Sequence, residues 1–259
     1  MRRAGLAVWQ AHQISGALVR PGVTTGELDA AVEVYFQKIG AIPLFKNYPH
    51  SQKGKPSFPA VTCISVNEEV VHGIPGPRVL VEGDVVSVDT GCKVDGWCGD
   101  AALTHGVGRI SPESQKLLDV TRGVLALAVE LLGTKDRWSG VAGEMAKYVA
   151  DHGFYTVECF VGHGIGREMH EAPQVPNFVN KSLRSSGDFL IEPGLVIAVE
   201  PMVNAGTKRV KGMPDHWTQS TQDGKPSAHF EHTIAITADG PRLLTAAPTP
   251  EEIAAGLPL

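Results

Sequence analysis

The pattern of apolar and polar residues along the chain predicts four helices. The first residues, MRRAGLAVWQAHQ, have a short apolar stretch that polar residues soon interrupt, as in an amphipathic helix. Thr24 and Glu27 form a candidate capping box for a second helix, which ends near Gly40. Start and stop signals place the remaining two over 111–133 and about 139–152.

Apolar runs that end in acidic residues predict buried strands with carboxylates at their ends. One such run leads into Asp89, and a second, LVIAV, leads into Glu200. A further β-rich run, AHFEHTIAIT, contains Glu231. An isolated buried carboxylate is costly unless it is paired or coordinated. Several of them in a chain of modest charge therefore suggest a shared cation.

One hairpin brings two of the acidic residues together. Asp95-Gly96 is a type I′ turn signal between apolar-rich strands. Counting back from that turn places Gly91 opposite Asp100, so Asp89 shares a face with Asp100 one diagonal step away. Such diagonal Cβ atoms lie about 7–8 Å apart, and the two carboxylates could flank two metal ions roughly 3.5–4 Å apart.

Composition and charge narrow the class of protein. A chain of 259 residues with 42% hydrophobic and 20% charged residues is ordinary for a globular protein. At this length it can form one large domain or two small ones. The net charge is −5, without the basic patch that nucleic-acid binding needs. The apolar stretch at the start is too short for a signal peptide or membrane helix.

The cysteines form neither a zinc motif nor a disulfide framework. Cys92 and Cys98 are six residues apart on facing strands, and the hairpin register points them to opposite faces. With Cys63 and Cys159 they fit a reducing compartment, so we expect a cytoplasmic protein. The stretch 41–60, rich in Pro, Lys and Ser, is predicted to be a loop.

Five motifs in order along the chain carry a family resemblance. The chain resembles the type I methionine aminopeptidases, the peptidase family with the pita-bread fold, over nearly its whole length. The motifs are CISVNEEVVHGIPG (63–76), GDVVSVDTG…DGWCGD (83–100), GHGIGREMHEAPQVPN (162–177), IEPGLVIAVEPM (191–202) and SAHFEHTIAIT (227–237).

The resemblance implies the architecture. We expect an α/β (α+β) fold with a central, curved antiparallel sheet and outer helices. A single catalytic domain would span 1–259, in two pseudo-symmetric halves of approximately 1–125 and 126–259. Compared with the family, the chain begins inside its first helix, which we expect to affect folding slightly and the chemistry not at all.

The resemblance also implies a centre of two divalent metal ions. Asp89 would bind one ion with both oxygens, Asp100 and Glu231 would bridge the two, and His163 and Glu200 would complete the ligands of the second ion. The ions would activate a water, and Glu200 would shuttle its proton. An oxygen-rich set with one imidazole and no thiolate favours Co, Mn, Fe(II) or Zn.

Two further histidines are expected to contact substrate. In the family's pattern His72 would form a hydrogen bond near the nitrogen of the scissile peptide bond. His170 would stabilise the oxyanion of the tetrahedral intermediate. The side-chain pocket would be formed by Cys63, Phe58, Trp217 and Met169. The loop before Phe58 departs from the family's Tyr-x-Gly-Tyr-Pro run, so we expect one wall of the pocket to differ. We assign no role to the other histidines: His12, His50, His105, His152, His216, His229 and His232.

The expected function is removal of the initiator methionine from nascent polypeptides, with a preference for a small second residue. The partners would be the N-termini of those chains, including chains at the ribosome, and not nucleic acid or membrane; we expect a monomer. One alternative is an Xaa-Pro-type peptidase of the same fold, which usually has an additional N-terminal domain. Another is a non-catalytic binding member, which would typically have lost metal ligands.

Overall fold

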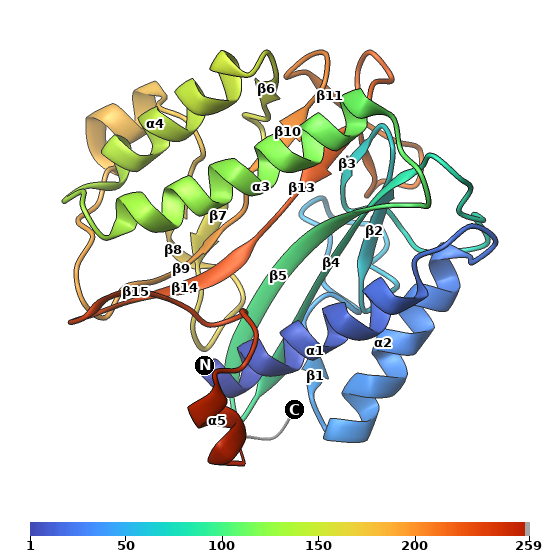
Figure 1. Cartoon of the computed structure of the whole chain (residues 1–259), viewed down its shortest axis with the longest axis horizontal. Coiled ribbons are helices and arrows are strands. Elements are labelled where there is room, and N and C mark those ends of the chain that lie inside the picture. Colours follow the sequence, from blue (N-terminus) through green and yellow to red (C-terminus); the bar gives the residue numbers. More distant parts are fainter. Residues whose placement is uncertain (257–259) are drawn as a thin grey trace.

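Five α-helices are present in the computed structural model, which describes residues 1–256 (Figure 1). They are α1 (Arg2–Leu18), α2 (Thr25–Ile39), α3 (Pro112–Leu132), α4 (Trp138–Asp151) and α5 (Pro250–Ala254), and a short π-helical turn covers Leu183–Gly187.

Local signals explain where the predicted helices start and stop. The Thr24 hydroxyl accepts a hydrogen bond from the Glu27 backbone N–H, and the Glu27 carboxylate accepts one from the Thr24 backbone N–H, at 3.2 and 2.7 Å. This reciprocal pair satisfies two backbone donors that would otherwise lack partners. The helix ends at Gly40, which adopts the left-handed conformation with φ of 67°. The capping-box prediction is confirmed.

The strands of the described residues form four antiparallel sheets. The first contains β1 (Ile42–Pro43), β2 (Cys63–Val66), β4 (Val85–Val94) and β5 (Trp97–Gly106). The second contains β6 (Tyr155–Thr156), β10 (Met202–Asn204) and β13 (Ser227–His229), and the third β3 (Glu69–Val71), β11 (Val210–Gly212) and β12 (Gln219–Thr221). The fourth runs in the order β15 (Gly240–Leu243), β14 (His232–Thr237), β9 (Val196–Val199), β7 (Gly162–Gly164) and β8 (Glu171–Val175).

The β4–β5 hairpin has the predicted register. Gly91 pairs with Asp100, and both turn residues, Asp95 and Gly96, have positive φ of 52° and 74°. A Cβ at Gly91 would lie 2.9 Å from Oδ1 of Asp100. Glycine at this position therefore leaves the room that the Asp100 carboxylate occupies.

A seam of hydrogen bonds joins β5 to the strands near the C-terminus. The Glu231 backbone N–H donates to the Ala102 carbonyl at 2.9 Å. The Asp100 N–H donates to the Thr233 hydroxyl at 3.0 Å, and that hydroxyl donates back to the Asp100 carbonyl at 2.8 Å. These hydrogen bonds fix Asp100 and Glu231 relative to each other, although the two residues lie far apart in the sequence.

Two details differ from the sequence expectations. The β-rich run over 228–237 is two strands, because Glu231 pairs with β5 between a first strand that joins β10 and a second that joins β9. Within the predicted loop 41–60, Ile42–Pro43 forms β1 and pairs with Cys92 and Lys93 of β4. Both pairings are long-range, and local patterns do not report them.

The helices cover the sheets in two groups. Figure 1 shows α1 lying along β4 and β5 with α2 beside α1, and α3 and α4 over the strands of the later half, and the contacts between these elements agree. The largest fully buried side chain is that of Trp138, in the core cluster that α3 and α4 share with those strands. This arrangement confirms a mixed α/β fold with antiparallel sheets and outer helices.

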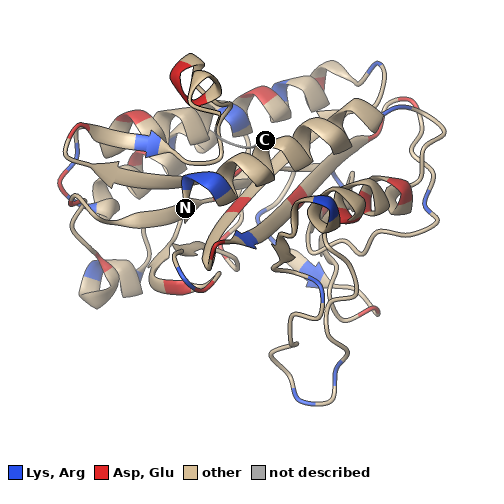
Figure 2. Cartoon of the chain, turned by 90° about the horizontal axis from the view of Figure 1, so that it is seen from below, with Lys and Arg blue, Asp and Glu red and all other residues tan. Residues whose placement is uncertain are grey.

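Figure 2 shows the positions of Lys and Arg interspersed with those of Asp and Glu along the ribbon. None of the helices within residues 1–256 combines the length and apolar character required to cross a bilayer.

Candidate metal centre

One cavity of about 490 Å³ gathers every site residue that the sequence predicts. It is lined by all of the candidate ligands and by the residues expected to contact substrate: Asp89, Asp100, His163, Glu200 and Glu231 with His72, His170, Cys63, Phe58, Trp217 and Met169. Residues far apart in the sequence therefore line one cavity.

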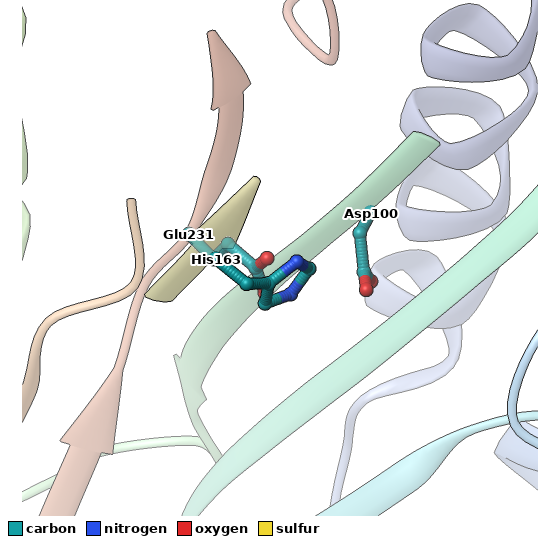
Figure 3. A group of neighbouring side chains, drawn as sticks. All are labelled: Asp100, His163 and Glu231. Atoms are coloured by element: carbon teal, nitrogen blue, oxygen red, sulfur yellow. The ribbon is translucent and has the colours of Figure 1, made fainter. Parts of the chain in front are cut away.

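Three of these residues form the tightest group. Asp100 on β5, His163 on β7 and Glu231 between β13 and β14 each offer a ligand atom, and these atoms all lie within 4.8 Å of one another. Figure 3 shows the three side chains reaching one space from separate elements. All three are buried.

The other two candidate ligands lie beside this group. Oε1 of Glu200, which follows β9, is 3.7 Å from Nε2 of His163. Asp89 lies on β4, paired with Ala102 of β5. Buried oxygens of Asp89, Asp100 and Glu231 have no hydrogen-bond partner within residues 1–256.

The carboxylates raise one another's pKa, but burial is the larger cause. Loss of hydration raises the pKa of Asp100 to about 8. Burial, then the charges of Asp100 and Glu200, hold the pKa of Asp89 well above its usual range. The pKa values of Glu200 and Glu231 are raised for the same reasons, burial first and neighbouring carboxylates second.

His163 is oriented to offer a lone pair. Its Nδ1 lies 2.9 Å from the Gly164 carbonyl oxygen, which can only accept, so Nδ1 carries the proton. Nε2 is then the free acceptor, the arrangement typical of a metal-binding imidazole. Burial, then the neighbouring His170, lowers the pKa of His163 to about 4, which keeps the ring neutral.

The donor set fits divalent metal. No Lys or Arg lines the cavity among the described residues, so the buried carboxylates have no cationic side chain to neutralise them. Their unpartnered oxygens and the neutral Nε2 of His163 are the ligands that Mn, Fe(II), Co and Zn accept. A cation in this space would satisfy groups that are otherwise costly to bury.

His72 lies at a strained position at the edge of this centre. Its φ of 60° is in the left-handed region, where a non-glycine residue is uncommon. Its ring packs edge-on against Phe160, with ring centroids 5.3 Å apart. Burial, then the neighbouring His170, lowers the pKa of His72 to about 4. The ring of His170 lies 4.4 Å from that of His163.

An apolar cluster forms the other side of the cavity. The residues that the sequence suggested for a side-chain pocket pack together, joined by two that it did not name, Phe45 and Ala60: the cluster is Phe45, Phe58, Ala60, Cys63 and Met169, with Trp217 against it. The rings of Phe58 and Trp217 meet edge-on at 5.3 Å.

Three histidines to which we assigned no role also line the cavity: His50, His216 and His229. His229 is 2% exposed, and its unpartnered Nε2 lies 3.9 Å from Glu200 and 4.0 Å from Glu231. Strand alternation offered a signal, since His229 is two residues before Glu231 and so on the same side. His232 instead turns away and bonds to Thr245, as alternation predicts.

A buried, carboxylate-rich centre beside an apolar pocket, on this fold, defines a metal-dependent hydrolase. A family model described as metallopeptidase family M24 matches residues 1–238. Methionine aminopeptidase 1 of Bacillus subtilis is 44% identical over 247 residues, covering 95% of this chain and 94% of that protein. The chain belongs to metallopeptidase family M24.

Solved structures agree with that membership. The methionine aminopeptidase of Thermotoga maritima superposes with a TM-score of 0.88 at 40% identity, covering 95% of each chain. A prolidase from Pyrococcus furiosus superposes at 0.73 but is 18% identical, and the match spans only 63% of its length. The similarity to the prolidase shows only that the two proteins share a fold. The resemblance to methionine aminopeptidases is confirmed.

Proposed function

We propose that this protein is a methionine aminopeptidase that removes the initiator methionine from nascent polypeptides. The observation that carries the proposal is the cavity, in which buried, unpartnered carboxylates and an apolar cluster face one another. One side suits metal-assisted amide hydrolysis and the other suits an uncharged side chain. The similarity to named methionine aminopeptidases supports the same assignment.

Five residues would hold two divalent metal ions, Co, Mn, Fe(II) or Zn. We assign Asp89, Asp100, His163, Glu200 and Glu231 as the ligands because their side chains meet in one cavity without a neutralising cation. When bound, the metal supplies a water activated near neutral pH and polarises the scissile carbonyl.

Three of the chain's own groups would act on the peptide. Glu200 accepts the proton of the attacking water at a carboxylate oxygen and passes it to the leaving amine. His170 donates a hydrogen bond to the developing oxyanion. The strained backbone of His72 directs its ring toward the scissile nitrogen.

The apolar cluster would hold the methionine side chain. Aromatic rings of Phe58 and Trp217 and the soft groups of Cys63 and Met169 offer the contacts a thioether prefers. We also expect a preference for a small second residue, as the resemblance to the methionine aminopeptidases implies.

The chain would work as a monomer, as one catalytic domain over 1–259 with halves of approximately 1–125 and 126–259. All four cysteines are free, as we would expect in the cytoplasm. Its partners would be the N-termini of new chains, including those at the ribosome.

The direct test is methionine release from the tripeptide Met-Ala-Ser. Chelator-treated protein receives Mn, Fe(II), Co or Zn singly, with Glu200→Gln as the inactive control. We expect release only with metal and only from the wild-type protein. A folded protein that releases no methionine with any metal would contradict the proposal, and cleavage of a Met-Pro peptide in its place would favour the Xaa-Pro alternative.

A further inference from the structure

The hydroxyl of Tyr48 lies 2.7 Å from Nδ1 of His170, a hydrogen bond between residues far apart in the sequence. The two rings meet edge-on, with centroids 5.5 Å apart and an interplanar angle of 81°. Both side chains line the cavity. Tyr48 belongs to the polar loop that departs from the family pattern, so a contact there bears on how this chain's site is built.

The backbone holds Tyr48 in place although it lies in a loop. Its N–H donates to the Phe45 carbonyl at 2.9 Å, and its carbonyl accepts from the Phe58 N–H at 3.0 Å. The Asn47 N–H donates to the Phe58 carbonyl at 2.8 Å. The loop is therefore closed at its base by Phe58, and the hydroxyl reaches His170 from a fixed position.

The far part of the same loop is tied to the opposite rim of the cavity. The Trp217 indole N–H donates to the Pro56 carbonyl at 3.0 Å, and His50 Nε2 lies 3.1 Å from the His216 carbonyl. The loop thus forms a wall held at both sides, and Tyr48 is the residue of this wall that bonds to a histidine of the site.

The bond decides which nitrogen of His170 carries the proton. A phenol is a better donor than acceptor, so the hydroxyl donates to Nδ1 and the ring proton lies on Nε2. The His163 ring, packed edge-on at 4.4 Å, limits rotation of the imidazole. Within residues 1–256 no protein group bonds to Nε2, which leaves that N–H for a ligand.

We propose that Tyr48 is a positioning residue for His170: its hydroxyl fixes the tautomer and orientation in which Nε2–H faces the carbonyl oxygen of the substrate. The inference rests on the proposed function, because it assigns a partner to the histidine that would stabilise the oxyanion. A preorganised donor stabilises developing charge without reorienting during the reaction.

Tyr48→Phe tests the inference because it removes one oxygen and keeps the ring in the cavity wall. We expect kcat to fall about tenfold and KM to change by less than about twofold, as for loss of an interaction made in the transition state. Tyr155→Phe is the matched control, since Tyr155 is exposed on β6 and is not part of the cavity. It should match the wild-type enzyme.

Two further measurements separate positioning from a general structural effect. In zinc-loaded protein with ¹⁵N-labelled histidine, two-bond ¹H–¹⁵N spectra should show the Nε2–H form of His170, assigned by its absence in His170→Gln. Tyr48→Phe should change that signal alone. In a double-mutant cycle, Tyr48→Phe should have no effect on kcat in the His170→Gln background.

Wild-type kcat in Tyr48→Phe, an unchanged His170 signal, or additive losses in the double variant would each overturn the proposal. Failure of the proposed function gives a different result, because the wild-type protein itself would then release no methionine. The histidine spectra would still report whether Tyr48 sets the tautomer.

Discussion

At the scale of single residues, burial decides the chemistry of both the carboxylates and the histidines. The acidic residues of the cavity lose hydration without gaining a cationic side chain, and their pKa values rise. The buried histidines lose hydration as well, and their pKa values fall, to about 3 for His229. A set of neutral imidazoles beside carboxylates is suited to binding a cation, because it adds donors without adding charge.

His12 allows a test of this effect outside the cavity. It lies on α1, 2% exposed, with Nε2 2.9 Å from the Ala101 carbonyl oxygen. Burial lowers its pKa from 6.5 to about 4. Between pH 6.5 and 4 His12 is therefore protonated in the unfolded chain but neutral in the folded protein. The stability that neutral His12 contributes is fully present above pH 6.5 and is lost as the pH falls through 4.

We therefore expect His12→Gln to flatten the acid dependence of stability. Gln keeps a donor near Ala101 and does not titrate. Between pH 7.5 and pH 5 the free energy of unfolding should fall by about 2 kcal/mol more in the wild-type protein than in the variant. Urea denaturation of chelator-treated protein at both pH values measures this. Identical falls in the two proteins would show that His12 does not contribute.

At the scale of elements, close backbone contacts hold the strands that carry the site. Gly164 follows His163 in β7, and a Cβ at Gly164 would lie 2.1 Å from the Ala172 carbonyl oxygen of β8. Only glycine permits this approach, because the obstacle is backbone and cannot move aside as a side chain does.

We expect Gly164→Ala to lower the free energy of unfolding by about 1–3 kcal/mol and to weaken metal binding through His163. Gly143→Ala is the control within α4, since its Cβ would meet nothing closer than Val179 at 3.7 Å. There alanine should stabilise by about 0.5–1 kcal/mol. Urea denaturation and calorimetric titration with Co(II) provide both readouts. Equal effects of the two variants would contradict the close-contact argument.

Elements with local signals could be predicted from the sequence, and those that depend on distant partners could not. The Thr24 capping box and the Asp95-Gly96 turn specify their own geometry, so α2 and the β4–β5 register were confirmed. The edge strand β1 and the break at Glu231 depend on pairing with β4 and β5, which no local pattern reports.

The same limit applies to the candidate site. The carboxylates follow apolar runs, and that pattern is visible in the sequence. Tyr48 reaches His170 because Phe58 closes its loop, and His229 lies beside Glu200 because β13 joins β10. Both contacts depend on the path of the chain in three dimensions.

At the scale of the whole molecule, the two ends of the described chain are joined. The Arg2 guanidinium bonds both oxygens of Glu252, at 2.9 and 2.7 Å, and the Leu244 carbonyl at 2.7 Å. Arg242 bonds the same carboxylate at 2.7 Å. The Glu252 side chain is only 8% exposed, so water screens these charges weakly.

We expect Glu252→Gln to lower the free energy of unfolding by about 1–3 kcal/mol, because it leaves two guanidinium groups without their anion. Glu158→Gln is a matched control: Glu158 pairs with Lys208 at 2.9 Å, but both side chains are largely exposed. Its removal should cost less than about 1 kcal/mol. Thermal unfolding of both variants, loaded with the same metal, shows whether the buried ion pair contributes more to stability than the exposed one. Equal losses in the two variants would contradict the expectation.

The position of the proposed metal centre would make it a link between the two proposed halves of the molecule. Asp89 and Asp100 come from the first half, whereas His163, Glu200 and Glu231 come from the second. A ligand that binds only the folded chain stabilises it by an amount set by its concentration relative to Kd, about 2.7 kcal/mol at a hundredfold excess. If both halves hold the metal, this stabilisation must appear in the unfolding of the entire chain.

We therefore expect added Co(II) or Mn to raise the midpoint of a single thermal transition, and a chelator to reverse the shift. Asp100→Asn should stay folded but lose most of the shift, because it removes a carboxylate from the tightest group of candidate ligands. Calorimetry of both proteins with and without metal tests this. An equal shift in Asp100→Asn, or metal that separates the unfolding into two transitions, would mean that the ion is held within one half and does not couple them.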